Sequence, residues 1–119
     1  MNFLQKLTLY LLLYFTLSTS LIGQAVHIPD PNLRAAIRDT LSLSDDAPLT
    51  QDHMLKLKRI GYKLRGISNL AGLEYATNLE SLALHVNEIT DIRPLAGLTK
   101  LFHLNLRNKD WADYADFTD

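Results

Sequence analysis

The chain has 119 residues, enough for one domain with or without a targeting segment. Hydrophobic residues make up 47% and charged residues 21%, so the chain can bury a core and does not have the composition of a disordered protein. A net charge of −1 offers no general attraction to nucleic acid or to an acidic membrane surface, and the lack of cysteine excludes disulfides and thiolate metal sites.

Residues 1–25 have the layout of a secretory signal peptide. Lys6 gives a positive start, an apolar run is densest over residues 7–17, and Gly23-Gln24-Ala25 ends in a small-x-small pattern. We therefore expect cleavage after Ala25, contact with the membrane only during export, and a secreted or cell-surface location. The alternative is a retained anchor, since the uncharged stretch extends over residues 7–29.

Residues 26–56 predict a helical segment. Asp30 is suited to cap a helix that begins with Pro31. One face of that helix carries the apolar residues Leu33, Ala36, Ile37 and Leu41. A second short helix is expected after Thr50. Its inward residues would be Met54 and Leu55.

Residues 57–119 repeat with a period of 22 residues, which predicts about two and a half units, the last one incomplete. The central unit contains Leu79, Leu82, Leu84, Asn87, Ile89, Ile92 and Leu95. The preceding unit contains Leu57, Ile60, Tyr62, Arg65, Ile67, Leu70 and Leu73. The following unit contains Leu101, Leu104, Leu106, Lys109, Trp111, Tyr114 and Phe117. All aligned columns are apolar except the one that holds Arg65, Asn87 and Lys109.

The last ten residues, DWADYADFTD at 110–119, are the second half of the third unit. Trp111, Tyr114 and Phe117 occupy the columns of aliphatic residues that we expect in the core, so they are interpreted as core residues and not as a ligand site. Two interpretations of this end stay open. The aromatic residues close the array, or the chain is the start of a longer one.

The segment LESLALHVNEI at 79–89 matches the consensus L-x-x-L-x-L-x-x-N-x-L, so the sequence resembles the leucine-rich repeat family. The period and the phrase ITDIRPLAGLTKL at 89–101 resemble the bacterial internalin-type subgroup. IPDPNLRAAIRDTL at 28–41 resembles the helical N-terminal cap of that group. The resemblance implies an α/β fold, a leucine-rich repeat solenoid whose short curved parallel sheet follows a helical cap at residues 26–56.

The resemblance also implies a role for Asn87, whose side-chain amide would bind backbone groups in the turn after the strand. Arg65 and Lys109 interrupt this asparagine ladder on both sides. Asp91 and Pro94 are typical of the tight return on the convex side.

Strand alternation sends Leu82 and Leu84 into the core and the residues between them outward, onto the concave surface. The candidate ligand-binding residues there are Lys63, Ser81, Ala83, His85, His103, Asn105 and Arg107. This surface would be small and basic, with Phe102 at its margin. The alternative is a solvated face without a partner.

No pattern in the sequence predicts catalysis, a cofactor or a metal site. His85 and His103 would lie about four strand residues apart, roughly 13 Å along the strand, and could not share a metal. Residues 110–119 lack the glycine and terminal glutamate of a calcium loop. Ser81, His85 and Asp91 do not form a triad.

The leading hypothesis is therefore a secreted or cell-surface, non-enzymatic module that binds a protein, or less favourably a glycan, on the concave face, and not nucleic acid. The internalin resemblance implies surface adhesion or host interaction, as in some members of that group. The alternative is an N-terminal fragment, without independent activity, of a longer array or of a larger secreted enzyme.

Overall fold

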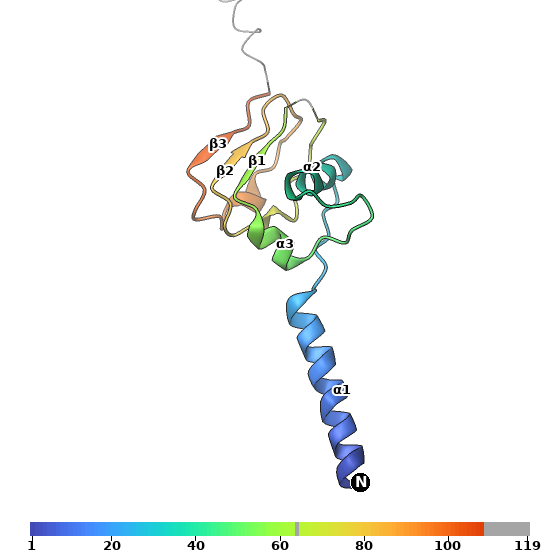
Figure 1. Cartoon of the computed structure of the whole chain (residues 1–119). Coiled ribbons are helices and arrows are strands. Elements are labelled where there is room, and N and C mark those ends of the chain that lie inside the picture. Colours follow the sequence, from blue (N-terminus) through green and yellow to red (C-terminus); the bar gives the residue numbers. More distant parts are fainter. Residues whose placement is uncertain (64, 109–119) are drawn as a thin grey trace, which may run out of the picture.

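The computed structural model describes residues 1–63 and 65–108, and the side chains of these residues outside 14–22. Figure 1 shows a long N-terminal helix, a small domain with a helical side, and a sheet on its other side. The helices are α1 (Phe3–Ile22), α2 (Pro31–Leu41) and α3 (Gln51–Lys56). The strands are β1 (Arg59–Gly61), β2 (Ser81–Ala83) and β3 (His103–Asn105), and two 3₁₀ turns are η1 (Leu73–Tyr75) and η2 (Arg93–Leu95).

Helix α1 extends away from the domain as a single helix (Figure 1), and its described apolar side chains are exposed, Leu4 by 69% and Tyr10 by 72%. No helix in the described part of the chain is both long enough and apolar enough to cross a membrane. The assignment of residues 1–25 as a signal peptide remains a prediction.

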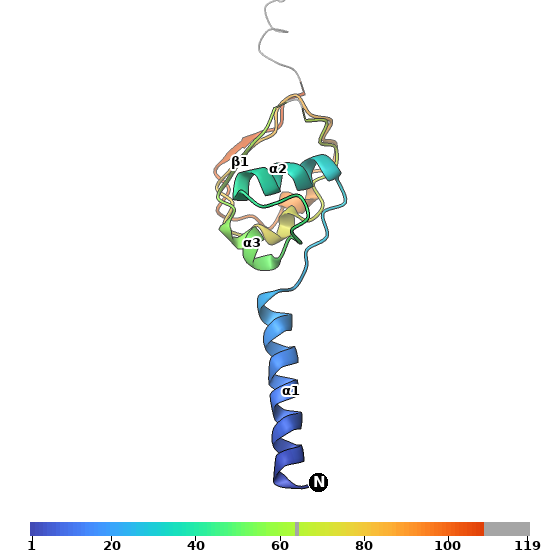
Figure 2. The same cartoon turned by 45° about the vertical axis from the view of Figure 1, so that its right-hand side comes forward.

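The three strands form a parallel sheet in the order β1-β2-β3. The register pairs Ile60 with Leu82 and Leu82 with Leu104, so each strand is displaced from the next by one 22-residue period. In Figure 2 the successive turns of the chain lie almost one behind another. The repeat and its register, both predicted from the sequence, are confirmed.

The core lies between the sheet, the 3₁₀ turns and the inner face of the cap. Its fully buried large side chains are Ile28, Leu33, Ile37, Met54, Leu57, Ile60, Ile67, Leu70, Leu73, Leu79, Leu82 and Leu84. Each such side chain stabilises the fold by about 1.5 to 3 kcal/mol relative to an exposed position. The aligned aliphatic columns of the repeat supply most of this set.

Helix α2 forms as its sequence predicts. The Oδ1 atom of Asp30 accepts hydrogen bonds from the backbone N–H groups of Asn32 at 2.9 Å and Leu33 at 3.1 Å, which caps the helix. Leu33, Ala36 and Ile37 are buried and Leu41 packs against the core from its margin. The helix ends at Leu41 and is capped by Ser42, which adopts a left-handed conformation with φ of 55°.

Helix α3 begins after Thr50, whose hydroxyl accepts the N–H of His53 at 3.3 Å. Met54 is buried as predicted, but the prediction for Leu55 is wrong, because that side chain is 44% exposed. Adjacent residues of a helix point about 100° apart, and in α3 the direction of Leu55 lies away from the core. Met54 and Leu57 take the inward positions.

Burial decreases toward the last strand. In the aligned column, Ile60 is 1% exposed, Leu82 is 0% exposed and Leu104 is 47% exposed. Strand β3 is thus the open edge of the sheet among the described residues. The expected continuation of this layer, with Lys109, Trp111, Tyr114 and Phe117, lies outside the described residues.

The repeat column that aligns Leu70 with Ile92 is buried in the first unit but not in the second. Leu70 is 1% exposed, but its repeat counterpart Ile92 is 56% exposed, which corrects the interpretation of that column. The cap explains the difference, because Ile28 and His27 lie against Gly72 in the turn that follows Leu70. The described part of the chain holds no such covering beyond η2.

Candidate functional site

The outward side chains of the three strands, and of the residues that continue them, make up a surface that we call the outer face. It consists of Arg59, Gly61, Lys63, Ser81, Ala83, His85, His103, Asn105 and Arg107. The seven candidate ligand-binding residues all lie on it. The strand register aligns Arg59, Ser81 and His103 in one row, and Gly61, Ala83 and Asn105 in the next.

A third row follows just after the strands. The Tyr62 N–H donates to the Ala83 carbonyl at 2.9 Å, and the Val86 N–H donates to the Arg107 carbonyl at 2.5 Å. Because these bonds continue the parallel pairing, Lys63, His85 and Arg107 are neighbours on successive strands. The three rows therefore run across the sheet, each one two residues further along the strands.

The middle row begins with the small residues Gly61 and Ala83 and ends with Asn105, and each outer row carries larger side chains at its two ends. No atom lies within 4 Å of the position that a Cβ would take on Gly61, so the space above it is open. Arg59 and His103 belong to one outer row, and Lys63 and Arg107 to the other. With about 3.3 Å per strand residue, the two outer rows are roughly 13 Å apart. We call the strip over Gly61 and Ala83, between the two outer rows, the trough of the outer face.

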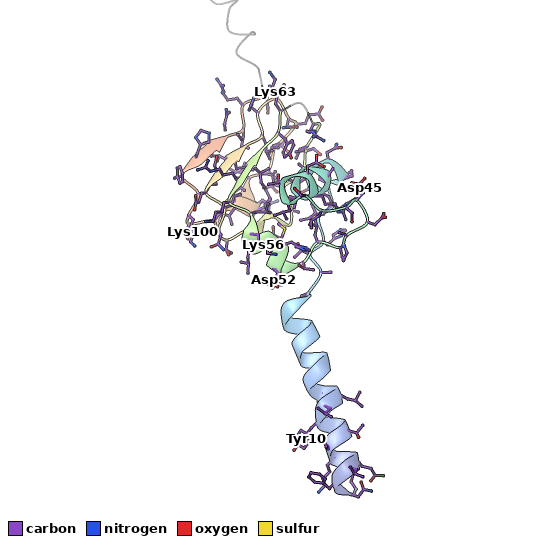
Figure 3. The ribbon with its side chains drawn as sticks, viewed as in Figure 1. Tyr10, Asp45, Asp52, Lys56, Lys63 and Lys100 are labelled. Atoms are coloured by element: carbon purple, nitrogen blue, oxygen red, sulfur yellow. The ribbon has the colours of Figure 1, made fainter. Side chains whose placement is uncertain are left out.

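The outer face carries cationic and neutral residues but no carboxylate. Arg59, Lys63 and Arg107 are its formal charges, and His85 and His103 are its titratable imidazoles. Figure 3 shows Lys63 at one end of the sheet and Lys56 and Lys100 at the other, whereas Asp45 projects from the helical cap. Acidic residues elsewhere on the described chain include Asp39, Asp46, Asp52, Glu74, Glu80, Glu88 and Asp91.

His85 has a feature that the sequence did not reveal. Its Nδ1 atom is buried and has no hydrogen-bond partner within the part of the chain that the structure describes. His85 is partly buried, whereas His103 in the first row is exposed. The strand register places His103 beside Ser81 and not beside His85, as predicted.

Asn87 fixes the backbone from which the third row extends. Its Oδ1 accepts the N–H groups of Arg65 at 3.1 Å and Ile67 at 2.9 Å. Its Nδ2 donates to the carbonyls of Tyr62 at 3.1 Å and Leu84 at 2.9 Å. Buried backbone groups of two successive turns are satisfied by this one amide, so the role that the family resemblance implies for Asn87 is confirmed.

Arg65 takes the place of asparagine in the preceding unit and is used differently. Its guanidinium lies 4.8 Å from the centre of the Tyr62 ring and bonds the carboxylate of Asp39 in α2 at 3.2 Å. This residue therefore links the first repeat to the cap. The pairing joins residues that are 26 apart in the sequence, so no local pattern could have indicated it.

Asp91 and Pro94, the residues predicted for the tight return, lie before and within η2, and Asp91 is bonded there to Arg93. The Asp91 Oδ1 accepts the Arg93 N–H at 3.0 Å, and its Oδ2 pairs with the Arg93 guanidinium at 2.7 Å. Hydrogen bonds from the Arg93 side chain and backbone lower the pKa of Asp91 to about 2. Asp91 therefore serves this turn and not a catalytic arrangement with Ser81 and His85.

No three histidine, aspartate or glutamate side chains of the described residues come together as metal ligands. A shallow hollow lies on α1, lined by Lys6, Leu9, Tyr10 and Leu13, and is a groove between the side chains of one helix. The region 110–119, considered for calcium, lies outside the described residues. The outer face is thus the candidate site, and its residue types suit recognition.

Comparison with known proteins gives relatives in solved structures. No protein-family model matches the chain, and no curated protein matches it. An internalin (inlF) from Listeria monocytogenes is 32% identical, with a TM-score of 0.67 over 75% of this chain and 27% of its own. The internalin C2 (inlC2) of the same species is 30% identical, with a TM-score of 0.64, over 75% of this chain and 38% of its own.

A third similar structure contains the CBM51-2 domain of ZmpB from Clostridium perfringens in complex with GlcNAc, together with INT domains of the same protein. It is 37% identical with a TM-score of 0.65, over 71% of this chain and 18% of that one. The chain thus corresponds to between 18% and 38% of the length of these proteins. The cap, the period, the parallel sheet and these likenesses agree, and the chain is an internalin-like leucine-rich repeat protein with a helical N-terminal cap.

Proposed function

We propose that this protein is a secreted or cell-surface, non-enzymatic module that binds a protein partner on the outer face, which is the concave face of the solenoid. The observation that carries the proposal is the trough on that face. A floor of small side chains between polar rows gives a partner close access to a rigid sheet, and buried Ile60, Leu82 and the Asn87 amide hold that sheet in place.

The margin of the face adds an apolar contact. Phe102 precedes β3 and is 78% exposed, next to His103 in the first row. Aromatic and arginine side chains contribute most strongly to protein interfaces when a partner covers them. Phe102 and Arg59 would then lie at one side of the interface and Arg107 at the other.

Export of the chain is supported by its N-terminus. The proposal assigns residues 1–25 as a signal peptide that is cleaved after Ala25, which leaves the cap to begin at Val26. The exposed apolar side chains of α1 do not pack into the domain core, as expected for a segment that is removed. Internalin-like neighbours support the same location by analogy.

Two other functions are favoured by particular observations. The structure of ZmpB that includes GlcNAc favours a glycan as an alternative ligand class. The small share of each neighbour that this chain covers favours a part of a longer repeat array or of a larger secreted enzyme. The second alternative places the activity of the whole protein outside this domain.

The test measures the binding of the purified chain, and of two tryptophan variants of it, to an array of extracellular protein domains and glycans. Ala83→Trp fills the floor of the trough, and Ala96→Trp places the same bulk at an exposed position after η2. We expect the unaltered chain and Ala96→Trp to bind the same protein domain and Ala83→Trp to lose that binding with an unchanged circular dichroism spectrum. Retained binding in Ala83→Trp contradicts the site, and binding only to glycans contradicts the partner class.

A further inference from the structure

We infer that the outer face recognises an acidic protein segment, in which Asp or Glu carboxylates contact both outer rows of the trough. The inference rests on the proposed function and names the chemistry of its partner. It is carried by the distribution of charge over the molecule and by the shape of the trough.

The charges of this protein are segregated. The whole chain carries 12 Lys and Arg against 13 Asp and Glu, a net charge of −1. A face that follows this average would hold as many acids as bases. The outer face instead holds Arg59, Lys63 and Arg107 with no acid among its nine positions. The excess of basic residues on this face matches the charge of an acidic partner.

The acids of the described residues lie outside this face. Asp39, Asp45 and Asp46 belong to the cap, and Asp91 is held by Arg93 in the turn before η2. Glu80 precedes β2 and Glu88 follows the third row. Because surface fields steer association and reject like charge, a basic face on a molecule whose acids lie elsewhere favours a partner that presents its acids to that face.

The trough also fits an extended chain that crosses the strands. Alternate side chains of an extended segment point to opposite sides, so an acidic run can present carboxylates to Arg59 on one side and to Arg107 on the other. Strands spaced about 4.8 Å apart make the three-stranded floor long enough for roughly three or four residues of such a segment. Gly61 and Ala83 allow its backbone to approach the sheet.

The test uses the full chain and a defined probe, a fluorescent Gly/Ser peptide with a central run of glutamates, and its glutamine counterpart. Fluorescence anisotropy at low and physiological salt measures binding. Arg59→Gln and Arg107→Gln each remove one charge from the outer face, and Arg93→Gln removes one charge from the turn before η2 as the matched control. Backbone NMR spectra check that each variant keeps its fold.

We expect the glutamate peptide to bind, the glutamine peptide not to bind, and added salt to weaken the complex. Arg59→Gln and Arg107→Gln should each reduce affinity by about tenfold, and Arg93→Gln should leave it unchanged. Equal binding of both peptides, or an equal loss in all three variants, overturns the inference. Tighter binding of a single-stranded oligonucleotide with the same arginine dependence also overturns it, in favour of nucleic acid.

The two proposals fail in different ways. If the glutamate peptide does not bind but Ala83→Trp still abolishes capture of an extracellular domain, the outer face is a protein-binding site without preference for acids. If Ala83→Trp has no effect on that capture, the site itself is wrong and the inference about its partner falls with it.

Discussion

The Oδ2 atom of Asp30 accepts a hydrogen bond of 2.8 Å from the backbone N–H of Ser68, which joins the start of α2 to the first repeat turn. The same oxygen accepts the Asn69 N–H at 3.0 Å, while Oδ1 caps the helix. Asp30 is buried, with an exposed fraction of 6%. One carboxylate thus fixes the orientation of the cap against the solenoid.

Replacement of Asp30 by asparagine should destabilise the protein by about 2 to 4 kcal/mol at neutral pH, because an amide nitrogen cannot accept the N–H groups that one carboxylate oxygen accepts. Urea unfolding of the full chain, followed by circular dichroism, measures the free energy of unfolding. Asp45→Asn is the control, since Asp45 is exposed in the loop after α2 and should change stability by less than about 0.5 kcal/mol.

The contribution of Asp30 should depend on pH. Burial raises the pKa of this carboxyl. The hydrogen bonds from the backbone N–H groups of Ser68, Asn69, Leu33 and Asn32 together lower the pKa by more than burial raises it, so the pKa lies below its ordinary value of 3.8. A lowered folded-state pKa stabilises the fold fully above the unfolded-state pKa and loses that effect as pH falls through the folded-state value. Urea titrations should therefore show a difference between the unaltered chain and Asp30→Asn that is constant near neutral pH and shrinks below about pH 4. A difference independent of pH contradicts this assignment.

Much of this architecture was predictable because it follows from local or periodic rules. The caps at Asp30 and Thr50 depend on side chains within a few residues of the helix start. The pairing of Ser81 with His103 follows from the 22-residue period, since a regular solenoid places equivalent residues side by side.

The features that escaped prediction depend on contacts between distant residues. The second role of Asp30 joins residues 38 positions apart, and Arg65 reaches Asp39 across the cap. Exposure of Leu55 and Ile92 depends on which neighbours cover them, which an apolar column cannot show. At the outer face, the sequence predicted the positions of the side chains but not the buried His85 Nδ1 atom, which has no hydrogen-bond partner among the described residues.

Substitution of Asn87 by alanine should destabilise the protein by about 2 to 4 kcal/mol, because buried N–H and carbonyl groups of two turns lose their partner. Asn69→Ala is the control. The Asn69 side chain accepts one bond, from the Ala71 N–H at 2.9 Å, and is exposed. Thermal unfolding of both variants tests the difference, and an equal loss in the two would show that the Asn87 amide has no special structural role.

Gly72 should not tolerate alanine. Its φ of 99° is unfavourable for any residue with a Cβ, and a Cβ there would collide with the Cδ1 of Ile28 and lie 3.0 Å from the His27 carbonyl oxygen. We expect Gly72→Ala to lower the free energy of unfolding by about 2 kcal/mol or more. Gly97→Ala, with open space around its Cβ, should change it by less than about 1 kcal/mol. Comparable urea midpoints for the two variants would contradict the close packing of the cap on Gly72.

The aligned leucines of β2 and β3 should respond differently to the same substitution. Leu82 is 0% exposed between two strands, so Leu82→Ala removes a fully buried side chain and should cost about 2 to 5 kcal/mol. Leu104 is 47% exposed on the open edge, and Leu104→Ala should cost about 1 kcal/mol or less because little burial is lost. Urea unfolding of the full chain at several protein concentrations measures both. A large, concentration-dependent loss in Leu104→Ala would mean instead that the last layer is covered in solution by another molecule.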